Sequence, residues 1–438
     1  MGAIQTTTPT QESLLERLHL ARKQSDELFN IVKPEFLYER PIEERHRIVF
    51  YVGHLEAFDW NLLRERVFQA ESFNPNFDRL FAFGIDPVDG AVPSDQPKDW
   101  PNIDGVRNYV SCARRTIDDN LSGHFSENTE TLLNVAIEHR LMHAETLAYM
   151  LHQLPYDQKQ CLHSKPHLVV DSTTPSMVEI PSGSATLGLS RDDTQFGWDN
   201  EYEIHRLDVP AFAIDKYMVT NGQYLEFIAA NGYKDETFWT QSDWQWITAH
   251  HIQHPVFWVH AGDGWNYRTM FAEISLPLDW PVYVSHAEAS AYARWAGKSL
   301  PTEAQWHRAA YGTTEGEQRV YPWGDAEPDS HKGNFDFYRW NPTRIGAFPQ
   351  GQSAFGAFDM LGNGWEWTST LFQPLPGFEA FPFYPGYSAD FFDGKHYVIK
   401  GGSARTAASM LRRSFRNWFQ PHYQYVYAGF RCVSERGE

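Results

Sequence analysis

The N-terminal part of the chain is organised around one stretch, residues 138–145, whose sequence is EHRLMHAE. It lies within residues 130–151, which are rich in Leu, Ala, Met and Glu and contain no Gly or Pro, so we expect a helix there. His139 and His143 are four residues apart and therefore project from the same face of that helix, one turn from each other. This spacing allows one metal ion to take two imidazole nitrogens from a single helix.

Three other segments before residue 154 also have helical patterns, and the four together predict a four-helix bundle. We expect these other helices over residues 13–32, 42–70 and 104–122. Residues 73–101 are rich in Pro, Asp and Gly, so we expect a long crossover loop there. The interior of a bundle is a usual place for metal ligands that come from facing helices.

A third histidine, His54, lies in the second predicted helix with Phe50 and Phe58 one turn to either side. A lone buried histidine is more often a hydrogen-bonded core residue, but together with His139 and His143 it completes a set of three imidazoles. Three histidines without an obvious carboxylate ligand leave coordination positions open for water, substrate or dioxygen. Glu138 and Glu145 have two interpretations: carboxylates that hold a ligand imidazole, or charges on the surface of the helix.

Composition excludes several classes of function. With 42% hydrophobic and 21% charged residues the chain is globular, and no stretch reaches the length of a membrane span. The net charge of −19 disfavours nucleic acid and anionic membranes as partners. Three cysteines in 438 residues and the lack of a visible signal peptide predict a cytoplasmic protein without a disulfide framework.

The second part of the chain differs in kind from the first. We expect the bundle over residues 10–154, a Pro-containing linker over residues 155–175, and a second domain over residues 176–436. In this domain short alternating runs predict strands over residues 177–181 and 207–214, and helices over residues 220–230 and 286–297. Its many Trp and Tyr residues are expected to form an aromatic-rich core. The fold class is therefore α+β.

Five motifs in this second domain occur in the order typical of the formylglycine-generating enzyme (sulfatase-modifying factor) domain: DNE at 199–201, DKYMVTN at 215–221, LPTEAQW at 300–306, YPWG at 321–324 and GNGWEWT at 362–368. That family has a C-type-lectin-like α+β fold. The first domain, with its three histidines and Glu145, resembles a DinB-like helical bundle. The pairing of the two resembles the EgtB/OvoA-type non-haem iron sulfoxide synthases. A formylglycine-generating enzyme itself is disfavoured, because it needs a close pair of cysteines near the C-terminus and only Cys432 is there.

The resemblance implies a cofactor, substrates and site residues. His54, His139 and His143 would bind Fe(II). With O2, the enzyme would form a carbon–sulfur or carbon–selenium bond at the imidazole carbon of hercynine, the Nα-trimethylated betaine of histidine, in ergothioneine- or selenoneine-type biosynthesis. Residues 415–419, FRNWF, would receive the carboxylate and trimethylammonium of hercynine through Arg416, Asn417, Trp418 and Phe419, since aromatic faces attract a quaternary ammonium group. Arg413, with Arg412 and Arg416, would bind the sulfur or selenium donor.

Two segments depart from the better-known EgtB proteins. Phe372 stands where those proteins have a proton-donating Tyr, so the candidates for that role are Tyr423, Tyr425 and Tyr427, together with Tyr384 and Tyr387. Arg140, Leu141 and Met142 occupy the positions between the helix histidines, where those proteins carry two Gln. Both departures favour a donor other than γ-glutamylcysteine, which leaves a cysteine-using EgtB or a SenA-like selenoneine synthase with a selenosugar donor. Two other classes stay open: a DinB-type metal-dependent thiol transferase, and a non-catalytic lectin-like binding module.

Overall fold

The computed structural model describes residues 11–84, 92–121, 126–160, 174–193 and 195–435. The chain divides into two compact units, residues 1–162 (unit 1) and residues 163–438 (unit 2). Most of the predicted linker, residues 161–173, lies outside the described residues, whereas its first part contains a short 3-10 helix, Tyr156–Gln158.

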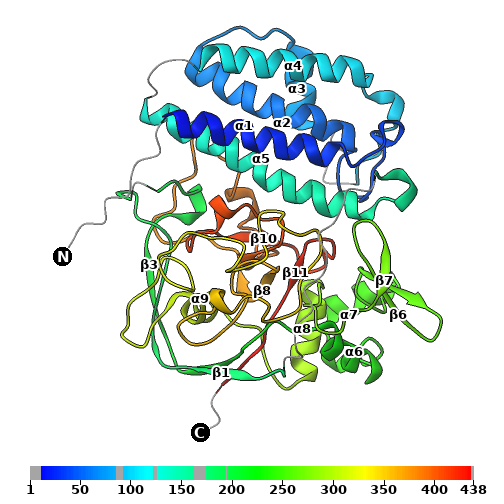
Figure 1. Ribbon diagram of the computed structural model, residues 1–438, viewed down its shortest axis with the longest axis vertical. Helices are drawn as coiled ribbons and strands as arrows, with labels where there is room; N and C mark the ends of the chain where they lie inside the picture. The colour runs from blue at the N-terminus through cyan, green and yellow to red at the C-terminus, as the bar shows by residue number, and fades with distance from the viewer. Residues whose placement is uncertain (1–10, 85–91, 122–125, 161–173, 194, 436–438) are drawn as a thin grey trace. The chain divides into compact units, whose positions relative to one another are not determined.

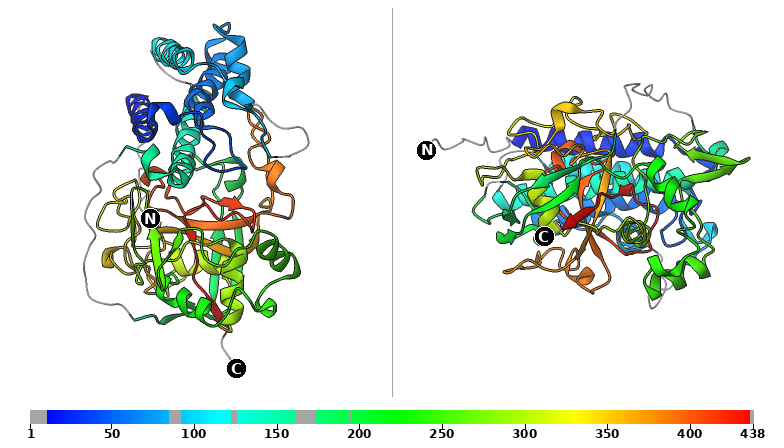
Figure 2. Two further views of the ribbon diagram at one scale, coloured as in Figure 1. Left: turned by 90° about the vertical axis from the view of Figure 1, so that its right-hand side faces the viewer. Right: turned by 90° about the horizontal axis from the view of Figure 1, so that it is seen from below.

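Unit 1 is helical (Figure 1). Its described residues form α1 (Gln11–Phe29), α2 (Ile48–Leu63), α3 (Pro75–Phe83), α4 (Ile103–Asn120) and α5 (Glu127–Gln153). The helix α2 packs on α3, α4 and α5, while α1 packs on α5; Figure 2 (left) shows α1, α4 and α5 close to end-on. All but three of the 16 residues of α2 are buried, so α2 is the core helix of this unit.

Two helical predictions in unit 1 are wrong in detail. A helix was expected over residues 42–70, but α2 begins at Ile48 and ends at Leu63, and a π-helical segment, Arg64–Phe68, follows it. Before α2 the Arg47 side chain fixes the turns of the chain, because its Nε donates to Asp95 Oδ2 at 2.9 Å and its Nη1 to the Tyr38 carbonyl at 2.8 Å. Residues 75–83, expected in a loop, form α3. Its start has a clear local cause, since the Asn74 side chain accepts the Phe77 N–H at 3.2 Å and Pro75 occupies the first helical position.

Unit 2 combines small sheets with short helices. Its described strands are β1 (Met177–Ile180), β2 (Gly183–Leu187), β3 (His205–Val209), β4 (Phe212–Asp215), β5 (Trp258–Ala261), β6 (Gly264–Arg268), β7 (Glu273–Ser275), β8 (Gly364–Leu371), β9 (Tyr397–Gly402), β10 (Asn417–Phe419), β11 (Ala428–Gly429) and β12 (Val433–Glu435). They form sheets of order β1-β4-β12, β10-β9-β8-β11, β2-β3 and β5-β6-β7. The helices are α6 (Asn221–Ala229), α7 (Gln241–Ala249), α8 (His286–Trp295) and α9 (Glu303–Tyr311).

The sequence predictions for unit 2 hold for β1, α6 and α8 and need correction elsewhere. Residues 207–214 form parts of two strands, β3 and β4, which join different sheets because Pro210 interrupts the ladder between them. The helices α7 and α9 were not expected, although each begins at a threonine whose side chain accepts a backbone N–H of the first turn, Thr240 and Thr302.

One buried ion pair joins three elements of unit 2. The Arg431 guanidinium contacts the Glu366 carboxylate of β8 through two bonds, Nε to Oε2 at 2.6 Å and Nη2 to Oε1 at 2.7 Å. Trp306 Nε1 of α9 donates to the same carboxylate at 3.0 Å, and Arg431 Nη1 donates to the Asp215 carbonyl at the end of β4 at 3.0 Å. Glu366, Trp306 and Asp215 all come from the motifs quoted above, and Arg431 joins them in the core of unit 2.

The predicted fold class, a helical region followed by an α+β domain, is confirmed. Among the described helices, none has the length and apolar character that crossing a lipid bilayer requires.

Candidate metal centre

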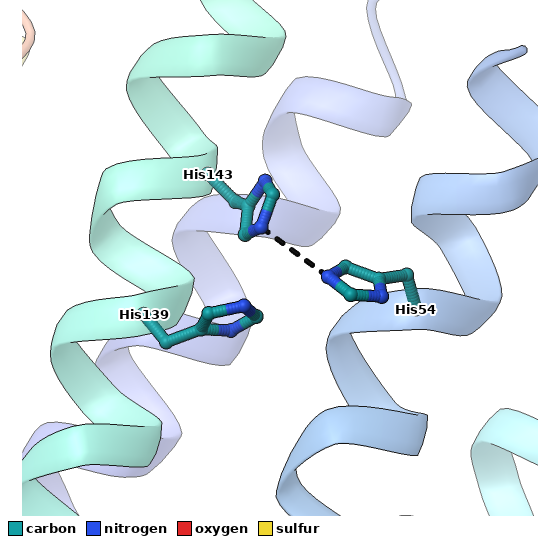
Figure 3. Close-up of side chains that lie close together, drawn as sticks. All are labelled: His54, His139 and His143. Atoms are coloured by element: carbon teal, nitrogen blue, oxygen red, sulfur yellow. Dashed lines mark hydrogen bonds between the residues drawn. The ribbon is translucent and has the colours of Figure 1, made fainter. Parts of the chain in front are cut away.

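The three predicted histidines meet inside unit 1. His54 comes from α2, and His139 and His143 come from successive turns of α5 (Figure 3). Their potential ligand nitrogens all lie within 4.8 Å of one another, and His54 Nε2 is 3.3 Å from His143 Nε2. Among the described residues this is the one group of three or more His, Cys, Asp or Glu side chains that is close enough to hold a metal ion.

The surroundings keep all three imidazoles neutral. Burial lowers the pKa of His54 to about 4. Burial also lowers the pKa of His139 and His143 well below the ordinary value, and the neighbouring imidazoles lower it further. A neutral imidazole is the form that binds metals.

The arrangement of protons fits a divalent transition metal. The His54 Nδ1–H donates to the Phe81 carbonyl at 2.7 Å, because a carbonyl can only accept. His54 Nε2 therefore carries a lone pair and directs it toward His143. The buried Nδ1 atoms of His139 and His143 have no hydrogen-bond partner among the described residues, so hydrogen bonding accounts for the placement of these rings only in part, through the contact of His143 Nε2 with His54 Nε2. A cation that takes one nitrogen from each of three imidazoles does account for it.

Aromatic rings fix the orientation of the imidazoles. The Phe58 ring stacks on His139 with centroids 3.5 Å apart and planes at 11°, and the Phe50 ring stacks on His54 at 4.7 Å. Tyr51 lies beside His143, with ring centroids 5.7 Å apart. The two Phe that flank His54 in the sequence thus hold two different ligands, one from each helix.

Sequence reasoning missed Gly53 and Phe81, which hold His54 in place. A Cβ on Gly53 would lie 2.4 Å from the Phe81 ring, so α3 can approach α2 closely only because residue 53 has no side chain. This approach brings the Phe81 carbonyl to His54 Nδ1. The sequence did contain a signal for this contact, because an isolated glycine inside a helical pattern, such as Gly53, often marks the close approach of another element.

Replacing Gly53 with alanine is expected to destabilise unit 1 by about 1–3 kcal/mol, because the added methyl group must displace the Phe81 ring. Urea unfolding followed by far-UV circular dichroism, which reports mainly on the helices, measures the change. Gly105→Ala in α4 is the matched control: its Cβ would meet nothing closer than 3.4 Å, and an alanine in a helix is expected to stabilise it slightly. Equal stability of the two variants would contradict the close-contact role of Gly53.

The two glutamates beside the helix histidines are not surface charges. Glu138 and Glu145 are only 2% and 8% exposed, so that interpretation is wrong. Their role as carboxylates that hold a ligand imidazole stays a prediction.

Comparison with known proteins places both units in one family. Residues 165–436 match the sulfatase-modifying factor enzyme 1-like domain. The hercynine oxygenase of Mycobacterium tuberculosis is 35% identical over 339 residues, which cover 75% of this chain and 77% of that protein. The chain belongs to the hercynine oxygenase family.

Two further relatives match over part of their length. The hercynine oxygenase of Mycolicibacterium thermoresistibile is 41% identical over 56% of this chain and 56% of that protein. Ergothioneine biosynthesis protein 1 of Neurospora crassa is 28% identical over 92% of this chain and 55% of that protein. The chain thus spans little more than half the length of these last two relatives.

In this member of the hercynine oxygenase family, the predicted substrate-binding segment is an edge strand. Asn417, Trp418 and Phe419 form β10, which pairs with β9 in the register Trp418 to Val398. All three side chains are half-buried. The Trp418 indole stacks on Phe372 with centroids 4.1 Å apart and planes at 9°, and Phe372 itself is fully buried. Residue 372 therefore supplies a ring on which the Trp418 indole stacks, a contact that needs no hydroxyl group.

The arginines predicted to bind ligands lie in different surroundings. Arg416 is buried and donates to Glu303 from Nε at 2.9 Å and from Nη2 at 3.1 Å. Arg412 is buried and donates from Nε to Glu201 at 2.7 Å. Arg413 is half-buried. Two of the three guanidinium groups are thus already neutralised inside unit 2.

The predicted proton donors also differ in burial. Tyr427 is fully buried, with the Arg405 guanidinium 4.0 Å above its ring. Tyr423 and Tyr425 are half-buried and neighbour each other, and Tyr423 stacks on Phe419 at 5.3 Å. Tyr387 lies 5.5 Å from Trp418. A role for any of these hydroxyl groups stays a prediction.

Cys432 is buried, and burial raises the pKa of its thiol well above the ordinary value. A buried thiol of this kind is unreactive.

Proposed function

We propose that this protein uses iron(II) and dioxygen to attach a sulfur or selenium atom to the imidazole carbon of hercynine. The observation that carries the proposal is the convergence of three neutral imidazoles from α2 and α5. The names of the relatives, hercynine oxygenase and ergothioneine biosynthesis protein 1, suggest the substrate and the pathway class.

In this proposal His54, His139 and His143 hold the iron. When bound, iron(II) supplies an electrophilic redox centre with open coordination positions for hercynine, donor and dioxygen. The protein fixes the ligand geometry before the metal arrives: the Phe81 carbonyl sets the tautomer of His54, and the Phe58 ring sets the plane of His139.

The overall reaction with a thiol donor is balanced as follows. The C–H bond of the hercynine imidazole carbon and the S–H bond of the donor break, and C–S and S–O bonds form. The two electron pairs released in these steps reduce one dioxygen molecule; one of its oxygen atoms enters the sulfoxide and the other leaves as water.

Two residues of β10 support recognition of hercynine. The Asn417 Oδ1 accepts the Trp418 N–H at 2.8 Å, which orients the amide so that its NH2 group remains to donate to a carboxylate. The half-buried Trp418 indole offers a π-face to a trimethylammonium group. Phe372 beneath that indole adds a second ring to the same stack.

The charges of unit 2 support a donor other than γ-glutamylcysteine. That donor carries two carboxylates, and hydrogen bonds from a cation are the strongest partners for a carboxylate. Glu201 and Glu303 neutralise Arg412 and Arg416, which leaves Arg413 among the three arginines. Cysteine and a selenosugar carry fewer carboxylates than γ-glutamylcysteine and need fewer cations for their recognition. Both donors therefore remain in the proposal.

One experiment tests the function directly. The protein is loaded with Fe(II) without oxygen, mixed with hercynine and one donor, exposed to O2 and analysed by mass spectrometry. We expect a hercynine adduct with cysteine or a selenosugar, formed with consumption of dioxygen, and little adduct with γ-glutamylcysteine. Activity that is independent of both iron and oxygen would instead identify a metal-dependent thiol transferase.

A further inference from the structure

Arg140 stands between the two histidines of α5 but its side chain is directed away from them. It is 1% exposed. Consecutive residues of a helix project about 100° apart, so His139 reaches the metal centre while Arg140 reaches the neighbouring flank of α2. An arginine buried this deeply inside a bundle needs a specific explanation.

The Arg140 guanidinium binds α2 at the level of His54. Its Nη2 donates to Asp59 Oδ2 at 2.6 Å and to the Leu55 carbonyl at 3.0 Å, and its Nη1 lies 3.0 Å from Glu56 Oε1. Nη1 also donates to Ser25 Oγ of α1 at 3.2 Å. Leu55 directly follows His54, and Arg140 directly follows His139, so the Arg140 side chain ties the α5 turn that carries His139 to the backbone of the α2 turn that carries His54.

Stability alone does not explain the contact. Asp59 and Glu56 are as deeply buried as Arg140, and the desolvation of such a cluster usually cancels most of its attraction. Apolar side chains of similar size would hold α2 and α5 together equally well. A fork of directed hydrogen bonds does something that apolar packing does not, because it fixes the axial and rotational register of the two helices.

We propose that Arg140 and Asp59 are a positioning pair that sets the register of α2 against α5 and thereby the separation of His54 from His139 and His143. The inference rests on the metal site of the proposed function. It gives Arg140 a role in the assembly of the ligand set without contact with substrate.

The test replaces the pair by apolar residues, Arg140→Met with Asp59→Leu. This removes one charge of each sign, and Glu56 keeps Arg114, whose Nε donates to it at 2.7 Å. Co(II) serves as the probe, because its visible absorption reports both affinity and coordination geometry. We expect the double variant to unfold in urea at about the wild-type midpoint. Its Co(II) dissociation constant should rise about 10- to 100-fold, with an altered absorption spectrum.

Two other variants complete the design. Arg22→Met with Asp118→Asn removes a 2.6 Å ion pair between α1 and α4 of the same unit, and Arg22 also lies 3.9 Å from Glu56. This control therefore disturbs the same charge cluster but leaves the bonds of Arg140 to Asp59 and Leu55 in place, and it is expected to leave Co(II) binding unchanged. Arg140→Lys keeps the charge but cannot bond to Asp59, Leu55 and Ser25 together. It should fold and bind Co(II) at least about threefold more weakly.

The outcomes separate this inference from the proposed function. Wild-type affinity and spectrum in the double variant, or in Arg140→Lys if the double variant does not fold, would overturn the positioning role. Undiminished Co(II) binding by His54→Ala would instead refute the metal site itself. Weakened binding in both Arg140 variants, with the Arg22 control unaffected, supports the proposal.

Discussion

Replacing His139 with alanine is expected to lower the rate of hercynine adduct formation at least about a thousandfold, equivalent to about 4 kcal/mol of transition-state stabilisation. Two imidazoles, one from each helix, would remain, and they would neither hold the metal tightly nor fix its open positions. The rate is measured by mass spectrometry under single-turnover conditions with excess Fe(II). Metal content after gel filtration, measured in parallel, should fall together with the rate.

His152→Ala is the matched control for this variant. His152 is buried in the same helix as His139 but does not belong to the histidine group, so its loss is expected to affect folding stability and not turnover. If His139→Ala retained full activity and metal content, a metal site on these three histidines would be excluded. Equal loss of activity in both variants would mean that damage to α5, and not loss of a ligand, is the cause.

The histidine cluster could be predicted because it depends on the spacing of residues that are close together in the sequence. The four-residue spacing of His139 and His143 determines that they share a helix face, whatever the rest of the chain does. His54 could be predicted for a similar reason, since Phe50 and Phe58, one turn to either side of it, indicate a buried helix face. In the structure these aromatic neighbours also orient the rings of His54 and His139, so the short pattern around His54 contained one candidate ligand and part of the support of two.

The support from more distant residues could not be predicted, because it depends on which helices become neighbours. The contact of Arg140 with Asp59 joins residues 81 positions apart, and the contact of His54 with the Phe81 carbonyl requires a helix where a loop was expected. No sequence pattern shows whether a charged residue between the two helix histidines, such as Arg140, contacts substrate or belongs to a positioning pair between helices. The start of α2 was missed for the same reason, since Asp95, which holds Arg47, is 48 residues away.

Arg416 illustrates how family resemblance and structure complement each other. The resemblance predicts that residues 415–419 lie near the substrate, but it does not say which of their side chains face it. The paired contacts of Arg416 with Glu303 show a guanidinium that is already saturated with a carboxylate. Asn417 and Trp418, the next two residues, retain a free amide NH2 group and an available aromatic face. Arg416 thus supports the fold, while recognition of hercynine by Asn417 and Trp418 stays a prediction.

Replacing Arg431 with methionine is expected to destabilise unit 2 by about 3–5 kcal/mol, because it leaves the Glu366 carboxylate buried without its cation. Both residues are 0% exposed, so water cannot replace the lost partner. Urea unfolding followed by tryptophan fluorescence measures the change, since all but two of the 16 Trp lie in unit 2. Arg191→Met is the matched control: its ion pair with Glu203 is equally short, at 2.6 Å, but more than a third exposed, and its loss should cost less than about 1 kcal/mol.

A second variant identifies the origin of the loss. If the unpaired charge were the whole cause, adding Glu366→Leu to Arg431→Met would restore stability, as apolar replacement of buried ion pairs often does. Arg431 also donates to the carbonyls of Asp215 and Phe358 at 3.0 and 2.9 Å, and Trp306 donates to Glu366. The double variant would leave these buried groups without partners, at about 1–3 kcal/mol each. We therefore expect it to remain destabilised, and full recovery would show that Arg431 serves only to neutralise Glu366.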